Sequence, residues 1–545
     1  MLKTRQSSVS VLGWRARTAT TLCASALLLA ACAVPGSPGP PGSRGAAAGV
    51  TAASFPLPRV SATDGATQLQ WLDRVAWGAN ASSAEQLAHA GLPAWLRAQL
   101  HPDAAGLPPA AQAQIDAMAL TRTPVDQLAV SLEAQRAAAQ ALTDDDQKKA
   151  AQREYQARLN ALLREARQRA VLRALYSPHQ LQEQMTWFWM NHFNVDARKD
   201  NLRALVGDYE ETAIRPHALG RFRDLLGATA HHPAMLRYLD NAQNAANRIN
   251  ENYARELMEL HTLGVGSGYT QADVQELARV LTGVGVTLRG SDAPPPRLRP
   301  ELQGAYVQQG LFEFNPARHD FGPKTLLGQP MTQRGLAEVD EALDRLARAL
   351  ATARFVSRKL AVYFVSDAPP LALVERMAAT FMRSDGDIAA VLTTMFESPE
   401  FSASLGRKFS DPLHYVIGSV RLAYDDRVVT NVGPMLGWID RMGEPLYTHA
   451  TPDGYPLTQD AWASAGQMAT RFEIARAIGA NGGVLFRAAD APAAAVPALP
   501  ALAASRAVRT AMPGWSADTR EALAQATSAP DWNTFLLASP EHMHR

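Results

Sequence analysis

The sequence predicts a single large domain of the all-α class that carries one small β-hairpin. Apolar residues recur at spacings of three and four along most of the chain, which is typical of amphipathic helices. Helix-capping residues precede several of these segments, and the alternation typical of half-buried strands is scarce. The predicted domain covers residues 65–545, with a low-complexity insertion rich in Ala and Pro at residues 488–504.

The N-terminus has the layout of a secretory signal. Four basic residues occur within residues 1–17, and no acidic residue precedes Asp64. Residues 18–31 are mostly apolar or small, but this run is shorter than the about 20 residues that a permanent membrane-spanning helix needs. We therefore expect residues 1–31 to be a signal peptide that is removed.

The apolar run ends in Leu-Ala-Ala-Cys at residues 29–32, which resembles the lipobox of bacterial lipoproteins. This resemblance implies lipidation of Cys32; the alternative is an ordinary signal cut near Ala31 with Cys32 merely nearby. Ala33 stands where an inner-membrane retention signal usually has Asp. By similarity to sorted lipoproteins, we expect a protein anchored to the outer membrane through its lipid, facing the periplasm or the exterior.

Composition indicates a tether and argues against disulfides and a nucleic-acid partner. Residues 32–64, rich in Pro, Gly and Ala, predict a flexible tether between lipid and domain. Cys23 leaves with the signal and Cys32 carries the lipid, so the mature chain can form no internal disulfide. The formal net charge is +1, from 53 basic and 52 acidic residues, so we expect no nucleic-acid partner.

The first two helices that capping signals identify lie between residues 143 and 190. Residues 143–146, Thr-Asp-Asp-Asp, predict the start of a charged helix over residues 147–174. Ser177 is a predicted cap, Pro178 the first helical residue and Gln180 the third, which starts the next helix. That helix is apolar all round at residues 187–190, so we expect it to be buried.

A third capping pattern, Thr270 with Asp273, predicts a helix that Gly283 terminates. The predicted hairpin pairs residues 311–314 with residues 325–327 through a connection at residues 319–322.

Several segments resemble the bacterial domain-of-unknown-function 1800 family over roughly residues 65–545. The resemblance implies an exported and mostly helical protein with no assigned reaction. Its genes often lie beside those of an exported family with a sulfatase-like fold, which suggests such a protein as partner. Val284 departs from the family pattern, which usually has Trp there. The matching segments are residues 189–193 (Trp-Met-Asn-His-Phe), 232–236, 250–257, 260–264, 269–271, 281–283, 319–324, 355–360 (Phe-Val-Ser-Arg-Lys-Leu) and 452–456 (Pro-Asp-Gly-Tyr-Pro).

Charged residues form a stripe on a predicted helix over residues 250–262. Glu251, Arg255 and Glu259 share one face at the spacing of successive turns, with Glu256 beside them. We favour a salt-bridged outer face, in which each exposed pair contributes about 0.3–0.5 kcal/mol. The alternative is a buried carboxylate pair around Arg255 that supplies a general acid.

The histidines suggest a metal site only if separate segments converge. Glu259 and His261 point about 200° apart on a regular helix and cannot share one ion. His192, His261 and His319 are the candidates, although each alone is more simply a hydrogen-bonded histidine. Glycines at positions 264, 266 and 268 follow a helix rather than a strand, so they predict helix termination and no nucleotide cofactor.

The sequence His-Asp-Phe-Gly-Pro-Lys at residues 319–324 brings three ionisable groups into one predicted turn. Turn chemistry explains Asp320 and Gly322 but not His319 or Lys324, which suggests a polar pocket.

Two functions remain open. One is a helical scaffold lipoprotein that binds an exported partner, because no complete catalytic motif and no Gly-x-Ser-x-Gly elbow occurs. The other is an envelope hydrolase or transferase with a His/Glu cluster in a cleft. The candidate residues are His192, Glu251, Arg255, Glu256, Glu259, His261, His319, Asp320 and Lys324.

Overall fold

The computed structural model describes residues 54–62, 64–289, 294–425, 427–487 and 499–545. The predicted signal peptide, Cys32, most of the tether and most of the insertion at 488–504 lie outside these residues. Residues 51–545 form one compact unit that is predominantly helical, which confirms the all-α fold class. In the described part of the chain, no helix is long and apolar enough to cross a membrane.

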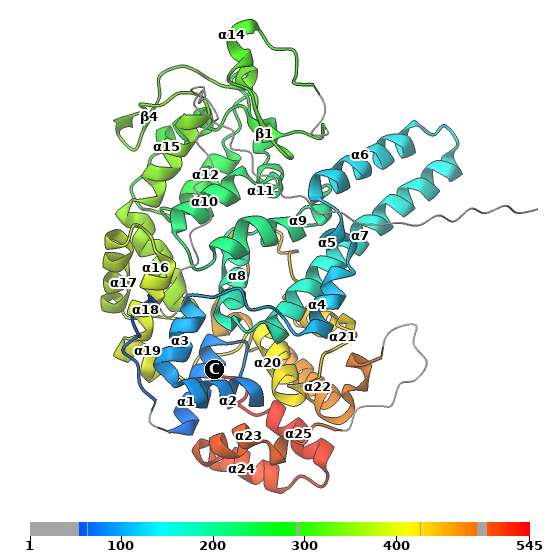
Figure 1. Cartoon of the computed structure of the whole chain (residues 1–545), viewed down its shortest axis with the longest axis vertical. Helices are drawn as coiled ribbons and strands as arrows, with labels where there is room; N and C mark the ends of the chain where they lie inside the picture. The colour runs from blue at the N-terminus through cyan, green and yellow to red at the C-terminus, as the bar shows by residue number, and fades with distance from the viewer. Residues whose placement is uncertain (1–53, 63, 290–293, 426, 488–498) are drawn as a thin grey trace, which may run out of the picture. The chain divides into compact units, whose positions relative to one another are not determined.

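The buried helix α8 (Gln180–His192) runs through the middle of the domain, and the other helices pack around it (Figure 1). All of its residues except Gln182 are buried, as its apolar sequence predicts. The helices that precede it are α1 (Gly65–Val75), α2 (Ala81–Ala90), α3 (Leu92–Leu100), α4 (Pro109–Asp116), α5 (Ala119–Arg122), α6 (Val125–Ala141) and α7 (Asp145–Tyr176).

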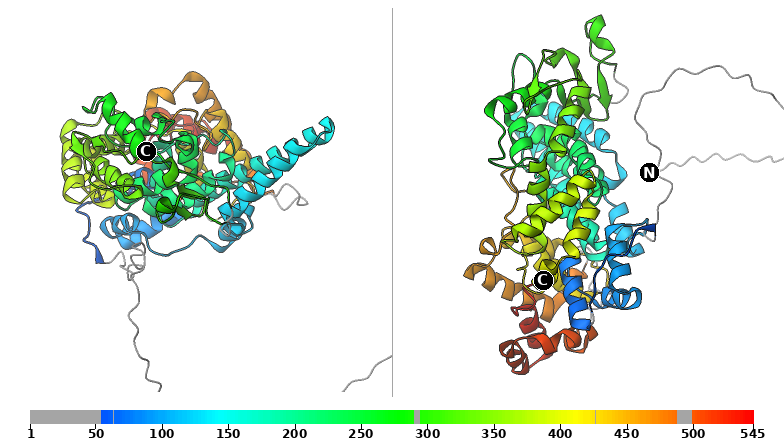
Figure 2. Two further views of the ribbon diagram at one scale, coloured as in Figure 1. Left: turned by 90° about the horizontal axis from the view of Figure 1, so that it is seen from above. Right: turned by 90° about the vertical axis from the view of Figure 1, so that its left-hand side faces the viewer.

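Helices α6 and α7 form an antiparallel pair that projects away from the rest of the domain in two views (Figures 1 and 2). Asp144 caps α7 by accepting a hydrogen bond from the Gln147 N–H (2.9 Å), as the acidic run at residues 143–146 predicts. A small separate core, which includes Leu132, Tyr155 and Leu159, holds the base of this arm together.

The start of α8 differs from the prediction. The helix begins at Gln180 rather than Pro178, and Ser177 makes no cap to a helical N–H. Tertiary contacts take over: the Gln180 side chain accepts from the Trp77 N–H (3.1 Å) and donates to the Ser177 carbonyl (2.8 Å). The loop after α1 is thereby tied to α8, which local capping rules cannot anticipate.

The middle of the chain covers one end of α8 with short helices and small sheets (Figure 1). The capping box of Thr270 and Asp273 forms as predicted at the start of α13. The elements of this region are α9 (Val206–Asp208), α10 (Phe222–His231), α11 (Pro233–Tyr238), α12 (Asn252–Glu259), α13 (Gln271–Val280), β1 (Val284–Val286), α14 (Pro300–Gln303), β2 (Val307–Gln309), β3 (Phe312–Phe314), β4 (Thr325–Leu326) and β5 (Gln329–Pro330).

The predicted pairing of residues 311–314 with residues 325–327 is wrong. Strand β3 pairs antiparallel with β1 and β2, and β4 pairs with β5. Both local hairpins close through two-residue turns, at residues 310–311 and 327–328, which contain a glycine with positive φ. Such turns match strand twist and cost less chain entropy than a ten-residue connection, so the local pairings are favoured.

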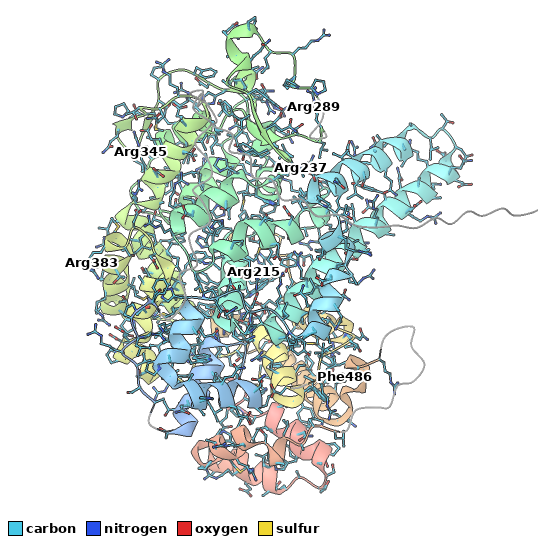
Figure 3. All side chains as sticks on the ribbon, viewed as in Figure 1. Arg215, Arg237, Arg289, Arg345, Arg383 and Phe486 are labelled. Carbon is cyan, nitrogen blue, oxygen red and sulfur yellow. The ribbon has the colours of Figure 1, made fainter. Side chains whose placement is uncertain are left out.

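The β4–β5 hairpin is fastened to α15 by one side chain. Arg345, labelled in Figure 3, donates to the carbonyls of Leu326 (3.1 Å), Gln329 (2.8 Å) and Pro330 (2.6 Å). The remaining helices are α15 (Leu336–Ala347), α16 (Leu350–Phe364), α17 (Leu371–Arg383), α18 (Ile388–Phe396), α19 (Pro399–Ser404), α20 (Pro412–Tyr424), α21 (Gly433–Arg441), α22 (Ala465–Asn481), α23 (Arg506–Ala511), α24 (Ala517–Ala524) and α25 (Ala529–Leu537).

Candidate functional site

The C-terminal end of α8 places His192 against the segment that follows α12. The His192 Nε2–H donates to the carbonyl of His261 (3.0 Å), so Nδ1 of the same ring carries a lone pair. That Nδ1 atom is buried and has no hydrogen-bond partner among the described residues. The two imidazole rings lie 6.1 Å apart between centroids. Two predicted site residues, His192 and His261, are therefore neighbours.

We had predicted one helix over residues 250–262, but His261 does not continue the helix that carries Glu259. Helix α12 ends at Glu259, and the His261 N–H donates to the Glu256 carbonyl five residues back (3.1 Å). Gly264 then closes the turn with φ +86°. The angle of about 200° between Glu259 and His261, which assumes a regular helix, does not apply. Both ring nitrogens of His261 are buried and lack a partner within the described ranges.

Lys359 reaches the same place from α16. Its Nζ lies 5.7 Å from the centroid of the Phe355 ring, and that ring lies 6.1 Å from the ring of His192. A side chain on Gly264 would place its Cβ 2.8 Å from Phe355, so glycine allows this close packing. The adjacent Arg358 is exposed, because neighbouring helix positions diverge.

A loop at residues 449–455 completes the site. Asn194 donates to the carbonyls of His449 (3.0 Å) and Thr451 (2.8 Å), which holds the loop against the end of α8. Asn191 pairs with the backbone of Tyr455 through both amide atoms, donating at 2.9 Å and accepting at 2.6 Å. Gly454, which precedes Tyr455, has φ +76°, and a Cβ there would lie 2.1 Å from the backbone carbonyl oxygen of Asn191. Only glycine fits, and the preceding Asp453 is thereby fixed in position.

Burial and charge shift the pKa values of four ionisable groups at this site. Burial and the neighbouring Lys359 charge lower the pKa of His261 to about 3 and that of His192 well below its usual value. Burial lowers the pKa of Lys359 to about 8, against the opposing effect of the Asp453 carboxylate. Burial and the charges of Glu259 and Asp453 raise the pKa of Glu256. The histidines are therefore neutral, and the Lys359 amine exchanges protons near neutral pH.

This arrangement suits acid–base chemistry. A lysine with a pKa near 8 can accept a proton, and a carboxyl group with a raised pKa can donate one. The unpartnered nitrogens of His192 and His261 are buried polar atoms without a hydrogen-bond partner among the described residues, and such atoms are rare in folded proteins. We refer to His192, Glu256, His261, Lys359 and Asp453 as the acid–base cluster.

Other predicted residues lie outside the acid–base cluster. Glu251 and Arg255 form an ion pair (3.0 Å), and Gln271 bonds to both of them. This is the geometry of a salt-bridged face. Glu259 stays separate from that pair and lies beside Tyr269, whose pKa is raised by burial and by the Glu259 carboxylate.

His319, Asp320 and Lys324 form a second, closed group below the small sheets. Lys324 Nζ donates to Glu338 Oε2 on α15 (2.7 Å), and both side chains are buried. His319 Nδ1–H donates to the Thr282 carbonyl (2.7 Å), and its Nε2 lies 3.3 Å from the same Glu338 oxygen. Asp320 pairs with Arg279 on α13 (2.8 Å). These contacts brace the turn, and none of them is with the acid–base cluster.

The residues that we considered for a metal do not converge. Within the part of the chain that the structure describes, no group of three or more His, Cys, Asp or Glu side chains has the geometry to hold a metal ion.

Sequence analysis missed Lys359, Asp453 and Glu338 as partners of the predicted residues. Lys359 and Asp453 lie in segments that carry the family resemblance, which was the available signal. Glu338 lies in an ordinary amphipathic helix, and only the packing of α15 against the 319–324 turn reveals its contacts.

Comparison with known proteins places the chain in a family. Neither the curated proteins nor the solved structures contain a match. One family model, described as a protein of unknown function (DUF1800), matches residues 70–544. This range covers most of the chain and includes every segment that meets at the acid–base cluster, so the chain belongs to the DUF1800 family.

Proposed function

We propose that this protein is an exported lipoprotein whose helical domain performs acid–base catalysis, as a hydrolase or transferase, on a molecule of the cell envelope. The observation that carries this proposal is the position of Lys359. Its ammonium group has no hydrogen bond or ion pair among the described residues, and it lies beside two histidines with unpartnered ring nitrogens. Polar groups without a hydrogen-bond partner destabilise the folded state, and ionisable groups with shifted pKa values cluster at functional sites.

The roles follow from the protonation states. In this proposal Lys359, in its neutral form, accepts a proton from the attacking group of the substrate, and Glu256, whose pKa burial raises, donates one to the leaving group from its protonated form. His192 and His261, both uncharged, orient the substrate through hydrogen bonds. Asp453 moderates the loss of charge at Lys359, because its carboxylate favours the ammonium form.

Chemical labelling tests the state of Lys359 without knowledge of the substrate. We expect acylation of Lys359 by a small amine-reactive reagent to rise with a midpoint near pH 8, because only the neutral amine reacts. Peptide mass spectrometry gives the extent of labelling at each pH, with the exposed Lys149 as internal reference. Identical pH curves for the two lysines would contradict the proposed base.

The matching functional test compares envelope extracts incubated with wild-type protein, Lys359→Met or Lys149→Met. Wild type and Lys149→Met should change the mass of the same envelope component, and Lys359→Met should not. The Lys359→Met protein should also melt at an equal or higher temperature, because a half-buried charge without an ion-pair partner is removed. Equal conversion by all three proteins would remove Lys359 from the mechanism.

Lipidation of Cys32 is tested by phase partitioning. The full chain, expressed with its signal in a bacterium, should enter the detergent phase, whereas Cys32→Ser should remain in the aqueous phase. Two or three acyl chains give stable anchoring, since each buried methylene contributes about 0.8 kcal/mol. An aqueous wild-type protein that retains Met1 would contradict both the signal peptide and the lipid.

The projecting α6–α7 arm supports a second function, the binding of an exported partner such as a protein with a sulfatase-like fold. Most side chains of residues 140–158 are exposed. Replacing residues 138–152 with a short loop should abolish co-purification of a partner from solubilised membranes and leave the catalytic assay unchanged. A partner that is retained by the shortened protein would exclude the arm as its binding site.

A further inference from the structure

A cavity of about 100 Å³ lies between α1, α20, α23 and the C-terminal residues, at the end of the domain where the blue and red helices meet (Figure 1). Its walls are mainly apolar and aromatic, with Trp77, Tyr415, Val508 and Trp515 among them. An apolar cavity of about 150 Å³ holds benzene in another protein, so this one has room for a molecule of a few heavy atoms. It shares no lining residue with the acid–base cluster.

Asp73 of α1 lines this cavity and has no ion-pair partner within the described ranges. Its Oδ1 accepts from the Ala79 N–H (2.7 Å), and no described donor reaches Oδ2. The nearby guanidinium groups bond elsewhere: Arg74 to Ser404 (2.8 Å) and Arg421 to the Gly78 carbonyl (3.1 Å). Burial raises the pKa of Asp73 to about 6, so the carboxylate is ionised at neutral pH but poorly compensated.

The other ionisable groups of the wall form hydrogen bonds with side chains or with the backbone, and Arg545 is the cation among them. Burial lowers the pKa of both His414 and His542 to about 4, which leaves both rings neutral. The Arg545 guanidinium is bonded to the Tyr363 carbonyl (3.1 Å) and to Gln184 (3.3 Å). A second carboxylate, Glu541, is satisfied by Ser516 and Thr519. Asp73 Oδ2 is therefore a carboxylate oxygen of this wall that no described donor reaches.

We propose that this cavity binds a small organic ammonium ion, with Asp73 as its counter-ion. The ammonium group would donate to the free Oδ2 of Asp73, and its carbon atoms would lie on the apolar wall. The aromatic ring of Trp77, which lines the cavity, favours the same charge, because a cation is attracted to the face of an aromatic ring. Removal of a short alkyl chain from water adds to the affinity.

Calorimetric titration of the full-length protein with three probes of similar size tests the charge preference. We expect n-propylammonium to bind, 1-propanol to bind at least roughly tenfold more weakly, which corresponds to about 1.4 kcal/mol, and propionate not to bind. Asp73→Asn keeps the acceptor for Ala79 and should abolish the preference for the ammonium probe. Glu473→Gln, which alters an exposed carboxylate outside the cavity, should bind as wild type does.

Two further variants separate the possible outcomes. Ala511→Leu fills the cavity from α23 and should abolish binding of the ammonium probe even where Asp73→Asn fails to fold. Lys359→Met should leave this binding unchanged, since the two sites are separate. The proposal is overturned if the alcohol binds as tightly as the ammonium ion, if propionate binds in its place, or if no probe gives a saturable signal.

Discussion

Glu338→Ala should lower the free energy of unfolding by about 3–5 kcal/mol, because it leaves the Lys324 ammonium buried without a counter-ion. Both side chains are shielded from water, and the remaining contacts of Lys324 are to the backbone carbonyls of Asp320 and Gly322. Those carbonyls cannot neutralise the charge. Chemical denaturation, followed by circular dichroism, measures the loss directly.

Two further variants show whether the loss reflects an unpaired charge. Glu375→Ala removes one partner of an exposed pair with Arg354 and should cost less than about 1 kcal/mol. The double substitution Glu338→Leu with Lys324→Met replaces both charges by apolar groups and should recover much of the stability. A double variant as unstable as Glu338→Ala would show that shape, not charge, dominates at this position.

Acidification from pH 6.5 towards pH 4 should unfold the protein cooperatively. Burial, together with nearby positive charge, lowers the pKa of His261 to about 3 and those of His414 and His542 to about 4, and it holds that of His192 well below normal. Between these values and the ordinary value near 6.5, the unfolded chain binds more protons than the folded chain. Stability is therefore intact above pH 6.5 and falls as the pH drops through this window.

The size of the effect follows from the number of histidines. One pKa unit corresponds to about 1.4 kcal/mol, so several strongly shifted groups together are comparable with a typical stability of about 5–15 kcal/mol. Asp73, Glu210 and Glu444 act in the opposite direction, because burial raises their pKa values and their folded forms bind protons first. Four buried histidines should outweigh these carboxylates and move the acid midpoint above pH 4.

Circular dichroism across pH 3 to 7 measures this midpoint. His261→Gln should shift it to lower pH, since one group that cannot be charged in the folded state is removed. His89→Gln, at an exposed position, should leave it unchanged. A helical signal that stays constant down to pH 4 would mean that the buried histidines accept protons without penalty.

Elements that depend on neighbouring residues in the sequence were predictable. The Thr270–Asp273 capping box forms as predicted, and the predicted capping segment at residues 143–146 contains the observed cap, Asp144, because capping needs only groups three residues apart. The burial of α8 follows from its apolar surface on all sides. The strand pairing was predicted wrongly, because several partners satisfy the same alternation and the short turn at residues 327–328 decides between them.

The candidate site was predictable in part. The sequence nominated His192 and His261 as candidates for a site formed by converging segments, and it left open whether Glu251 and Arg255 form a surface pair. The turn after α12 redirects His261, and the approach of Gly264 to Phe355 then brings α16 with Lys359 alongside. Neither the turn nor this contact could be predicted from periodicity in the sequence, because both depend on contacts between segments far apart in the chain.

The sequence by itself determined the helical fold class, the caps of individual helices and the export signal that we predict, because each is encoded by spacing over a few residues. Only the tertiary structure decided which ionisable groups are buried together. Protonation depends on solvation and on charges within a few ångströms, and those neighbours come from α8, α12, α16 and the 449–455 loop. The chemistry that we propose therefore depends on the packing of these four segments, which places the half-buried Lys359 amine beside the buried imidazoles of His192 and His261 and near the exposed Asp453 carboxylate.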